Sequence, residues 1–151
     1  GSTFTDLGRP ADGVPMLKRA LEGWKTMARA DPSDEAVQVW VWATRLSYGQ
    51  ALAQAGRLAE AIPVLSAAVA ERRAWHSARP DDPDRRRLLM KAEASFADAL
   101  ARAGRAGEAC LLYAEARGVA REMEKAGQLT GYDRQETLRI LKESEARFCG
   151  A

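Results

Sequence analysis

The sequence is poor in the side chains that bind metals or form disulfide frameworks. Its 151 residues include one histidine, His76, and two cysteines, Cys110 and Cys149. A Cys/His zinc site needs more ligands than these. In the repeat described below, Cys110 aligns with Val14 and Ile62, so we expect a small core residue. We expect Cys149 to be an exposed free thiol. The sequence therefore implies no disulfide, which fits a reducing compartment such as the cytoplasm.

Long apolar runs and long charge runs are also missing. No apolar stretch approaches the roughly 20 residues of a membrane span. The start shows no signal peptide, and Gly1-Ser2 is typical of an expression scar. Charged residues make up 29% of the chain, with a net charge of +2, and acids and bases alternate. The one basic run, Arg85-Arg86-Arg87, is expected to be a solvated face near a helix start. We therefore expect neither a membrane nor a nucleic acid as partner.

The sequence contains a repeat with a period of 48 residues. The decamer that starts at Gly56 has counterparts that start at Gly8 and Gly104. Without a gap, 14 of 48 positions are identical between 8–55 and 56–103. A fixed period of this size indicates stacked copies of one supersecondary unit.

The repeat divides the chain into a short start, one repeat domain and a tail. The expected segments are a scar and the remnant of a truncated helix at 1–7, a single domain at 8–148 with repeats near 8–55, 56–103 and 104–148, and a tail at 149–151. The remnant is expected because residues 3–7 align with the last turn of a helix in the later copies.

Each repeat is predicted to be a pair of helices. Apolar residues recur at spacings of three and four, and the chain is rich in alanine, which favours helix. Ser33 or Asp34 is expected to cap the second helix, and Gly56 to end it in the left-handed conformation. Pro15 and Pro63 should kink or restart their helices, unless the helices begin later than the repeat boundaries. The expected helices are 9–30, 34–55, 57–78, 82–103, 105–126 and 133–148.

These helix pairs resemble the tetratricopeptide repeat. The resemblance is carried by Gly49, Leu52, Gly56, Glu60, Ala61, Leu65 and Ala68, and again by Ala97, Leu100, Gly104, Glu108, Ala109, Tyr113 and Ala116. The small residues stand where that family packs its helices closely, and the large ones fill the space between. The chain departs from the family in its long period, in Arg45 and Glu93 where an early aromatic is expected, and in the late prolines Pro32 and Pro80. Long-period copies are found in kinesin light chains and resemble the C-terminal regions of some bacterial serine/threonine protein kinases.

The resemblance implies both a fold and a role. The fold is an all-α solenoid, a right-handed superhelix of antiparallel helix pairs. The role is a non-catalytic protein–protein interaction module of a larger bacterial signalling protein, without cofactor or metal, that binds a peptide or protein segment on its concave face. The residues that would line this face are Gln50, Gln54, Arg87, Lys91, Asp98, Arg102, Arg139 and Lys142. Five of these eight are basic, which favours an acidic partner segment.

A self-association module is the alternative. The helix at 9–30 lacks its partner helix in this sequence, so Val14, Leu17, Leu21 and Trp24 would expose apolar surface. Two copies could then pair through this face with twofold symmetry. The other interpretation is that upstream repeats normally cover it.

Catalysis has little support in the sequence. His76 is a lone histidine, and neither Ser95 nor Asp98 has a base within reach by sequence. No glycine-rich phosphate loop follows a strand, and no strand is expected at all. We therefore expect this chain not to be an enzyme.

Overall fold

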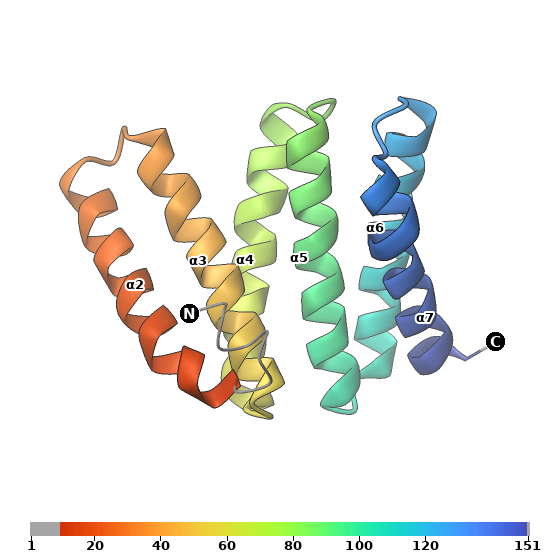
Figure 1. The fold of residues 1–151 in the computed structure, drawn as a ribbon, viewed down its shortest axis with the longest axis horizontal. Coiled ribbons are helices and arrows are strands. Elements are labelled where there is room, and N and C mark those ends of the chain that lie inside the picture. Colours follow the sequence, from red (N-terminus) through yellow and green to blue (C-terminus); the bar gives the residue numbers. More distant parts are fainter. Residues whose placement is uncertain (1–9, 151) are drawn as a thin grey trace. The chain divides into compact units, whose positions relative to one another are not determined.

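The computed structural model describes residues 10–150, which form helices joined by short links (Figure 1). The elements are α2 (Pro10–Ala30), α3 (Glu35–Gln54), α4 (Leu58–Ala78), α5 (Pro83–Arg102), α6 (Ala106–Lys125), η1 (Asp133–Thr137) and α7 (Leu138–Cys149). Residues 10–150 contain no strand, so the predicted all-α fold is confirmed. The predicted bounds of the first five helices agree within one residue. The expected remnant at residues 3–7 lies outside the described residues.

Contacts divide the chain into two compact units, Gly1–Ala68 and Val69–Ala151, and α4 contributes residues to both. In the first unit, α2 packs against α3 and runs antiparallel to it (Figure 1). Val14, Leu17 and Leu21 are all buried. The expectation that these side chains expose an apolar face is therefore wrong, since α2 already has a partner in α3.

The predicted close approach of the helices is present at Gly49. A Cβ atom added there would lie 2.6 Å from Leu65 Cδ2 and 2.8 Å from its Cγ. Leu65 is fully buried, as are Ala61 and Ala68 on the same helix. The α3 backbone therefore contacts a large side chain of α4 directly, where a side chain on Gly49 would not fit.

Glycines and aspartates set the helix ends as predicted. Gly56 and Gly104 have φ values of 79° and 83°, the left-handed conformation that ends a helix without Cβ strain. The Asp34 carboxylate accepts a hydrogen bond from the Val37 N–H at 3.3 Å. The Asp82 carboxylate caps α5 in the same way. Each cap satisfies a backbone donor that the helix itself leaves unpaired.

The prolines do not interrupt their helices. α2 continues through Pro15 and α4 continues through Pro63. The two helices begin later than the repeat boundaries at Gly8 and Gly56, which is the alternative left open above. Each proline is the sixth residue of its helix, because α2 begins at Pro10 and α4 at Leu58. At this position the missing N–H removes one hydrogen bond next to the first turn, where several groups lack intrahelical partners in any case.

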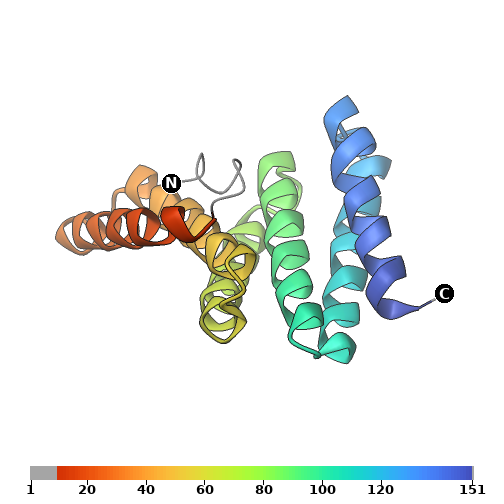
Figure 2. The same cartoon turned by 60° about the horizontal axis from the view of Figure 1, so that its bottom comes forward.

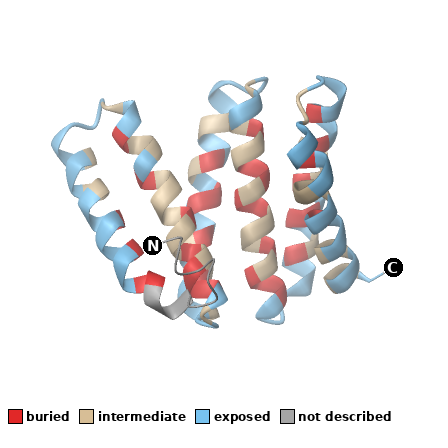
Figure 3. Cartoon of the chain, viewed as in Figure 1, coloured by how far each residue is buried: buried red, intermediate tan, exposed pale blue. Residues whose placement is uncertain are grey.

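In the second unit, α5 packs on α6 and α7 packs along α6 (Figure 2). Buried residues occur along the length of α5 (Figure 3), and on α6 they include Tyr113, Ala116 and Met123. The segment at 127–132 reverses the chain, so that α7 returns antiparallel to α6. Within residues 10–150, no helix has the length and apolar character that crossing a bilayer requires.

Gly49→Ala tests the close approach. The added methyl group would overlap the buried Leu65 side chain, and overpacking of this kind costs about 1–3 kcal/mol. Gly23→Ala is the matched control, since Gly23 is also inside a helix but has nothing within 4 Å of its Cβ position. It should stabilise the protein by about 0.5–1 kcal/mol through helix propensity. Urea denaturation measures both changes, and a stabilising Gly49→Ala would contradict the packing described.

Candidate functional site

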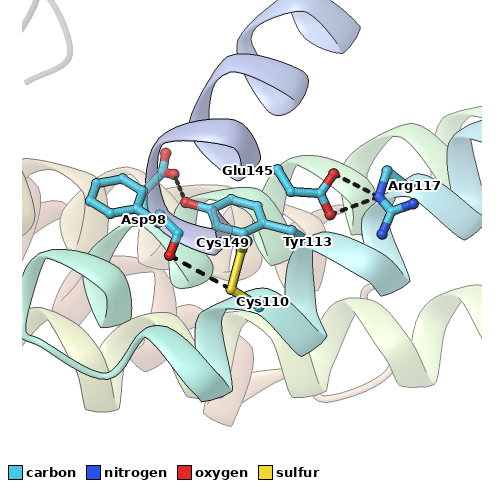
Figure 4. The surroundings of a disulfide bond; sticks show 7 residues. Asp98, Cys110, Tyr113, Arg117, Glu145 and Cys149 are labelled. Carbon is cyan, nitrogen blue, oxygen red and sulfur yellow. Dashed lines mark hydrogen bonds and ion pairs between the residues drawn. A yellow bond between two sulfur atoms is a disulfide. The ribbon is translucent and has the colours of Figure 1, made fainter. Parts of the chain in front are cut away.

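A disulfide joins the beginning of α6 to the end of α7, the last two helices of the second unit. Cys110 in α6 is bonded to Cys149, the last residue of α7, with a Cα–Cα distance of 5.8 Å (Figure 4). The expectations of a free thiol at Cys149 and of no disulfide are therefore wrong. The physical reason is the reversal between the two helices. Because α7 runs antiparallel to α6, the end of α7 lies beside the beginning of α6.

The sequence did contain a signal for this bond. The two cysteines are 39 residues apart, and the middle of this stretch falls at Leu129 and Thr130. This is the predicted loop between the two helices. Residues equally far from the turn of a helical hairpin lie side by side, so the predicted loop position was enough to place the cysteines together.

An open pocket with a volume of about 360 Å³ lies next to the disulfide. Asp98 and Arg102 of α5 form one wall. The other wall comes from α7 and consists of Glu143, Ser144, Arg147 and Phe148. Two of the predicted concave-face residues therefore share a pocket, but the α7 side of it was not predicted.

A hydrogen-bonded group of three side chains includes two residues that line this pocket, Asp98 and Ser144. The hydroxyl of Tyr113, a fully buried residue of α6, donates to Asp98 Oδ1 (Figure 4). The Ser144 side chain is hydrogen-bonded to both of these groups. Burial raises the pKa of Asp98, although the hydrogen bonds from Tyr113 and Ser144 oppose the shift. Burial and the adjacent Asp98 also raise the pKa of Tyr113. Three helices are thus joined through one buried phenol.

The rim of the pocket is charged. Glu143 is bound by Arg139, with 3.1 Å between Nη1 and Oε1. The Arg147 guanidinium lies 5.0 Å from the centre of the Phe148 ring. Both acids of the pocket therefore have partners within the chain, Tyr113 for Asp98 and Arg139 for Glu143. Arg102 and Arg147 place cationic groups on opposite walls.

The remaining predicted site residues are dispersed. Gln50 and Gln54 lie on α3, in the first unit, and Lys91 is half-buried on α5. Lys142 lines a second pocket of about 350 Å³, whose floor includes Leu138 and Leu141. The structure therefore gathers Asp98 and Arg102, and it brings Arg139 close through its bond to Glu143.

The basic run at the start of α5 is not a solvated face. Arg86 is 8% exposed and donates to Gln128 Oε1 at 2.9 Å. The Arg85 guanidinium lies 4.7 Å from the centre of the Trp75 ring and donates to the Trp75 carbonyl. Arg87 is bound by the loop before α7. The expectation for this run is therefore wrong, because its guanidinium groups hold neighbouring segments together.

Arg87 binds a buried carboxylate. It donates to both oxygens of Asp133 at 3.0–3.2 Å, and Asp133 is only 1% exposed. The Thr130 N–H donates to the same carboxylate at 3.0 Å. Burial by itself would raise the pKa of Asp133, but the hydrogen bonds from Arg87 and Thr130 lower it overall. The predicted ligand contact Arg87 is thus engaged within the chain.

A second buried acid lies between α4, α5 and α6. Glu93 is 1% exposed, and its side chain is hydrogen-bonded to that of Glu115. Glu115 also forms an ion pair with Arg73, with 2.6 Å between Oε2 and Nη2. Burial, followed by the bond to Glu115, raises the pKa of Glu93 to about 9. The raised pKa of Glu93 and the lowered pKa of Glu115 indicate that the pair shares one proton at neutral pH.

Comparison with known proteins gives no match: no family model, no curated protein and no solved structure matches this chain. What the fold and the site define is a class, an all-α chain of paired helices with a charged pocket beside a disulfide. The likeness to the tetratricopeptide repeat rests on the residues quoted above and stays a prediction.

Asp133→Asn tests the buried ion pair. Removing one partner of a buried pair costs about 3–5 kcal/mol, and the retained amide oxygen places this variant near the lower end. Because the folded-state pKa of Asp133 is lowered, its contribution is present above the unfolded pKa and is lost as the pH falls through the folded value. Asp84→Asn is the control, since Asp84 binds the same Arg87 from an exposed position. It should change the unfolding free energy by less than about 1 kcal/mol. Equal effects of the two variants would contradict the assignment.

Glu93→Gln tests the shared proton. The folded-state pKa is raised, so the wild type keeps its full stability below the unfolded pKa and loses stability as the pH rises towards about 9. The amide of glutamine donates to Glu115 but does not titrate, so the variant does not lose stability as the pH rises. The variant should therefore be more stable than the wild type by about 4–5 kcal/mol near pH 8 and by less than about 1 kcal/mol near pH 5. Thermal unfolding across this range measures the difference, with exposed Glu124→Gln as control. Parallel pH profiles would refute the assignment.

Proposed function

We propose that this chain is a non-catalytic interaction module of the tetratricopeptide type that binds an acidic segment of a partner protein. The observation that carries the proposal is the pocket between α5 and α7. In it, Asp98 and Arg102, which the repeat register assigns to the binding face, lie together with Arg147.

The charges of the pocket favour an anionic ligand. Asp98 is hydrogen-bonded by Tyr113, and Glu143 is paired with Arg139. Arginine offers five N–H donors in a planar fork that matches a carboxylate. A volume of about 360 Å³ is near the lower limit of small-molecule sites. It therefore suits one or two side chains of an extended segment better than a large cofactor.

The wider setting belongs to the same proposal. The module is expected to be one part of a longer bacterial signalling chain in the cytoplasm. Self-association is not favoured, because the apolar side chains that suggested it, Val14, Leu17 and Leu21, are buried.

A charge-reversed variant tests the proposal. Arg102→Glu/Arg147→Glu should weaken binding of a short fluorescein-labelled peptide of Asp, Glu and Leu by about tenfold or more, because it places two like charges beside the ligand. A peptide with Lys in place of the acids should not bind the wild type. Fluorescence polarisation measures both affinities.

The matched control reverses two arginines outside the pocket. Arg19→Glu/Arg79→Glu makes the same change in net charge at exposed positions and should bind the acidic peptide within about twofold of the wild type at moderate salt. Equal losses in the two double variants would show that binding is a nonspecific charge effect. An unchanged affinity of the pocket variant would overturn the site.

A further inference from the structure

The C-terminal end of α7 has few apolar contacts. Of its 12 residues, Leu141 is the one that is buried. Nearer the C terminus, Ser144, Glu145, Phe148 and Cys149 are half-buried and the others are exposed. Most of the stability of a helix in a protein comes from packing an apolar face, and these last turns offer little of one. The position of its last turns therefore depends on its individual contacts with α5 and α6.

Two kinds of contact hold these turns. The noncovalent ones are the ion pair of Arg117 with Glu145, at 2.8 Å, and the hydrogen bonds of Ser144. The Arg117 and Glu145 side chains are 40% and 22% exposed, so water and salt weaken their attraction. The other contact is covalent, the disulfide from Cys110 to Cys149. It holds the helix end whatever the solvent.

The same turns form most of the pocket wall. Four of the six lining residues, Glu143, Ser144, Arg147 and Phe148, belong to the seven-residue segment that ends at Cys149. Cys149 directly follows Phe148, and the Phe148 carbonyl oxygen lies 4.0 Å from Cys110 Sγ. A displacement of the disulfide end would therefore move this wall away from Asp98 and Arg102.

We propose that the Cys110–Cys149 disulfide is a redox-sensitive tether that keeps the ligand pocket formed. With the bond intact, the last turns of α7 lie against α6 and the pocket binds its acidic segment. After reduction these turns fray, Arg147 leaves its position opposite Arg102, and affinity falls. The identity of the ligand rests on the proposed function, whereas the release of α7 does not.

The chemistry requires a dithiol reductant and follows ordinary thiol–disulfide exchange. A thiolate of the reductant attacks one Sγ, the bond between Cys110 and Cys149 breaks, and a mixed disulfide forms. The second thiol of the reductant then displaces the remaining cysteine. The reductant is oxidised to its own disulfide, and the protein gains two thiols. In a reducing cytoplasm, disulfides that form at all are usually catalytic or redox-sensing, which agrees with this use.

The experiment compares oxidised and dithiothreitol-reduced protein. Cys110 and Cys149 are the only two cysteines of this sequence, so the reductant acts at a single disulfide. Reduction should lower the affinity for the acidic peptide by about tenfold and raise hydrogen exchange of the α7 amides by about tenfold, while α5 amides in the same sample stay protected. Far-UV circular dichroism checks that the protein remains folded. Cys110→Ser/Cys149→Ser should match the reduced wild type and show no response to the reductant.

The two readouts separate the two hypotheses. If the oxidised protein binds no acidic peptide, the proposed function fails, and exchange of the α7 amides alone decides the tether. Unchanged exchange after reduction would overturn the tether whatever the binding result. Faster exchange of the α7 amides with unchanged peptide affinity would show that the disulfide does not determine whether the pocket binds its ligand, which would also overturn the proposal.

Discussion

The helix pairs of this chain depend on small side chains at the points where two helices approach most closely. Gly49 leaves room for Leu65 in the first unit, and fully buried alanines such as Ala97, Ala109 and Ala116 occupy the corresponding places in the second. Close-packed helices cannot shift to accept larger groups, because interior packing has few voids. The large side chains that fill the remaining space, Leu65 and Tyr113, are therefore fixed in position as well.

This constraint explains how much of the fold could be predicted. Spacing, caps and left-handed glycines are local properties, and they placed Gly56, Gly104 and the first five helices within a residue of the observed bounds. Pro15 and Pro63 fit the alternative stated for them, because each helix begins two residues after its repeat boundary and the proline stands near the first turn. The exposure of α2 was predicted wrongly. Its apolar stripe was identified correctly, but the sequence analysis expected a missing upstream helix to cover it, although α3 packs against it.

The site was harder to predict, because it consists of contacts between helices that are distant in sequence. Asp98 and Arg102 are four residues apart on one helix, so their shared face follows from periodicity. The residues of the opposite pocket wall cannot be predicted from periodicity in this way. Arg147 and Ser144 reach this face only because the loop after α6 reverses the chain. Arg87 shows the opposite case. Its face was predicted from the repeat register, but its guanidinium binds Asp133, a pairing that charge alone could not distinguish from a free cation.

Charged side chains enter the core of this chain, one of them at a position where the sequence departs from the tetratricopeptide pattern. Glu93 stands at the position where that pattern expects an aromatic, and it is buried with a proton shared with Glu115. Arg72 is 2% exposed, and burial lowers its pKa. Such groups add little net stability compared with apolar residues of similar volume, since their desolvation offsets their attraction. They do restrict how the helices can pair, because each group must meet its own partner or remain unsatisfied in the interior.

Tyr113 connects this core to the pocket. Its ring packs in the interior of the second unit, while its hydroxyl binds Asp98 on the α5 wall of the pocket and Ser144 on the α7 wall. A change in the position of α7 therefore alters the contacts of both walls. Linkage then operates in both directions: if the oxidised disulfide favours the ligand, the bound ligand must favour the oxidised disulfide by the same factor. The pocket and the bond beside it are coupled, because the last turns of α7 contribute one wall of the pocket and one cysteine of the bond.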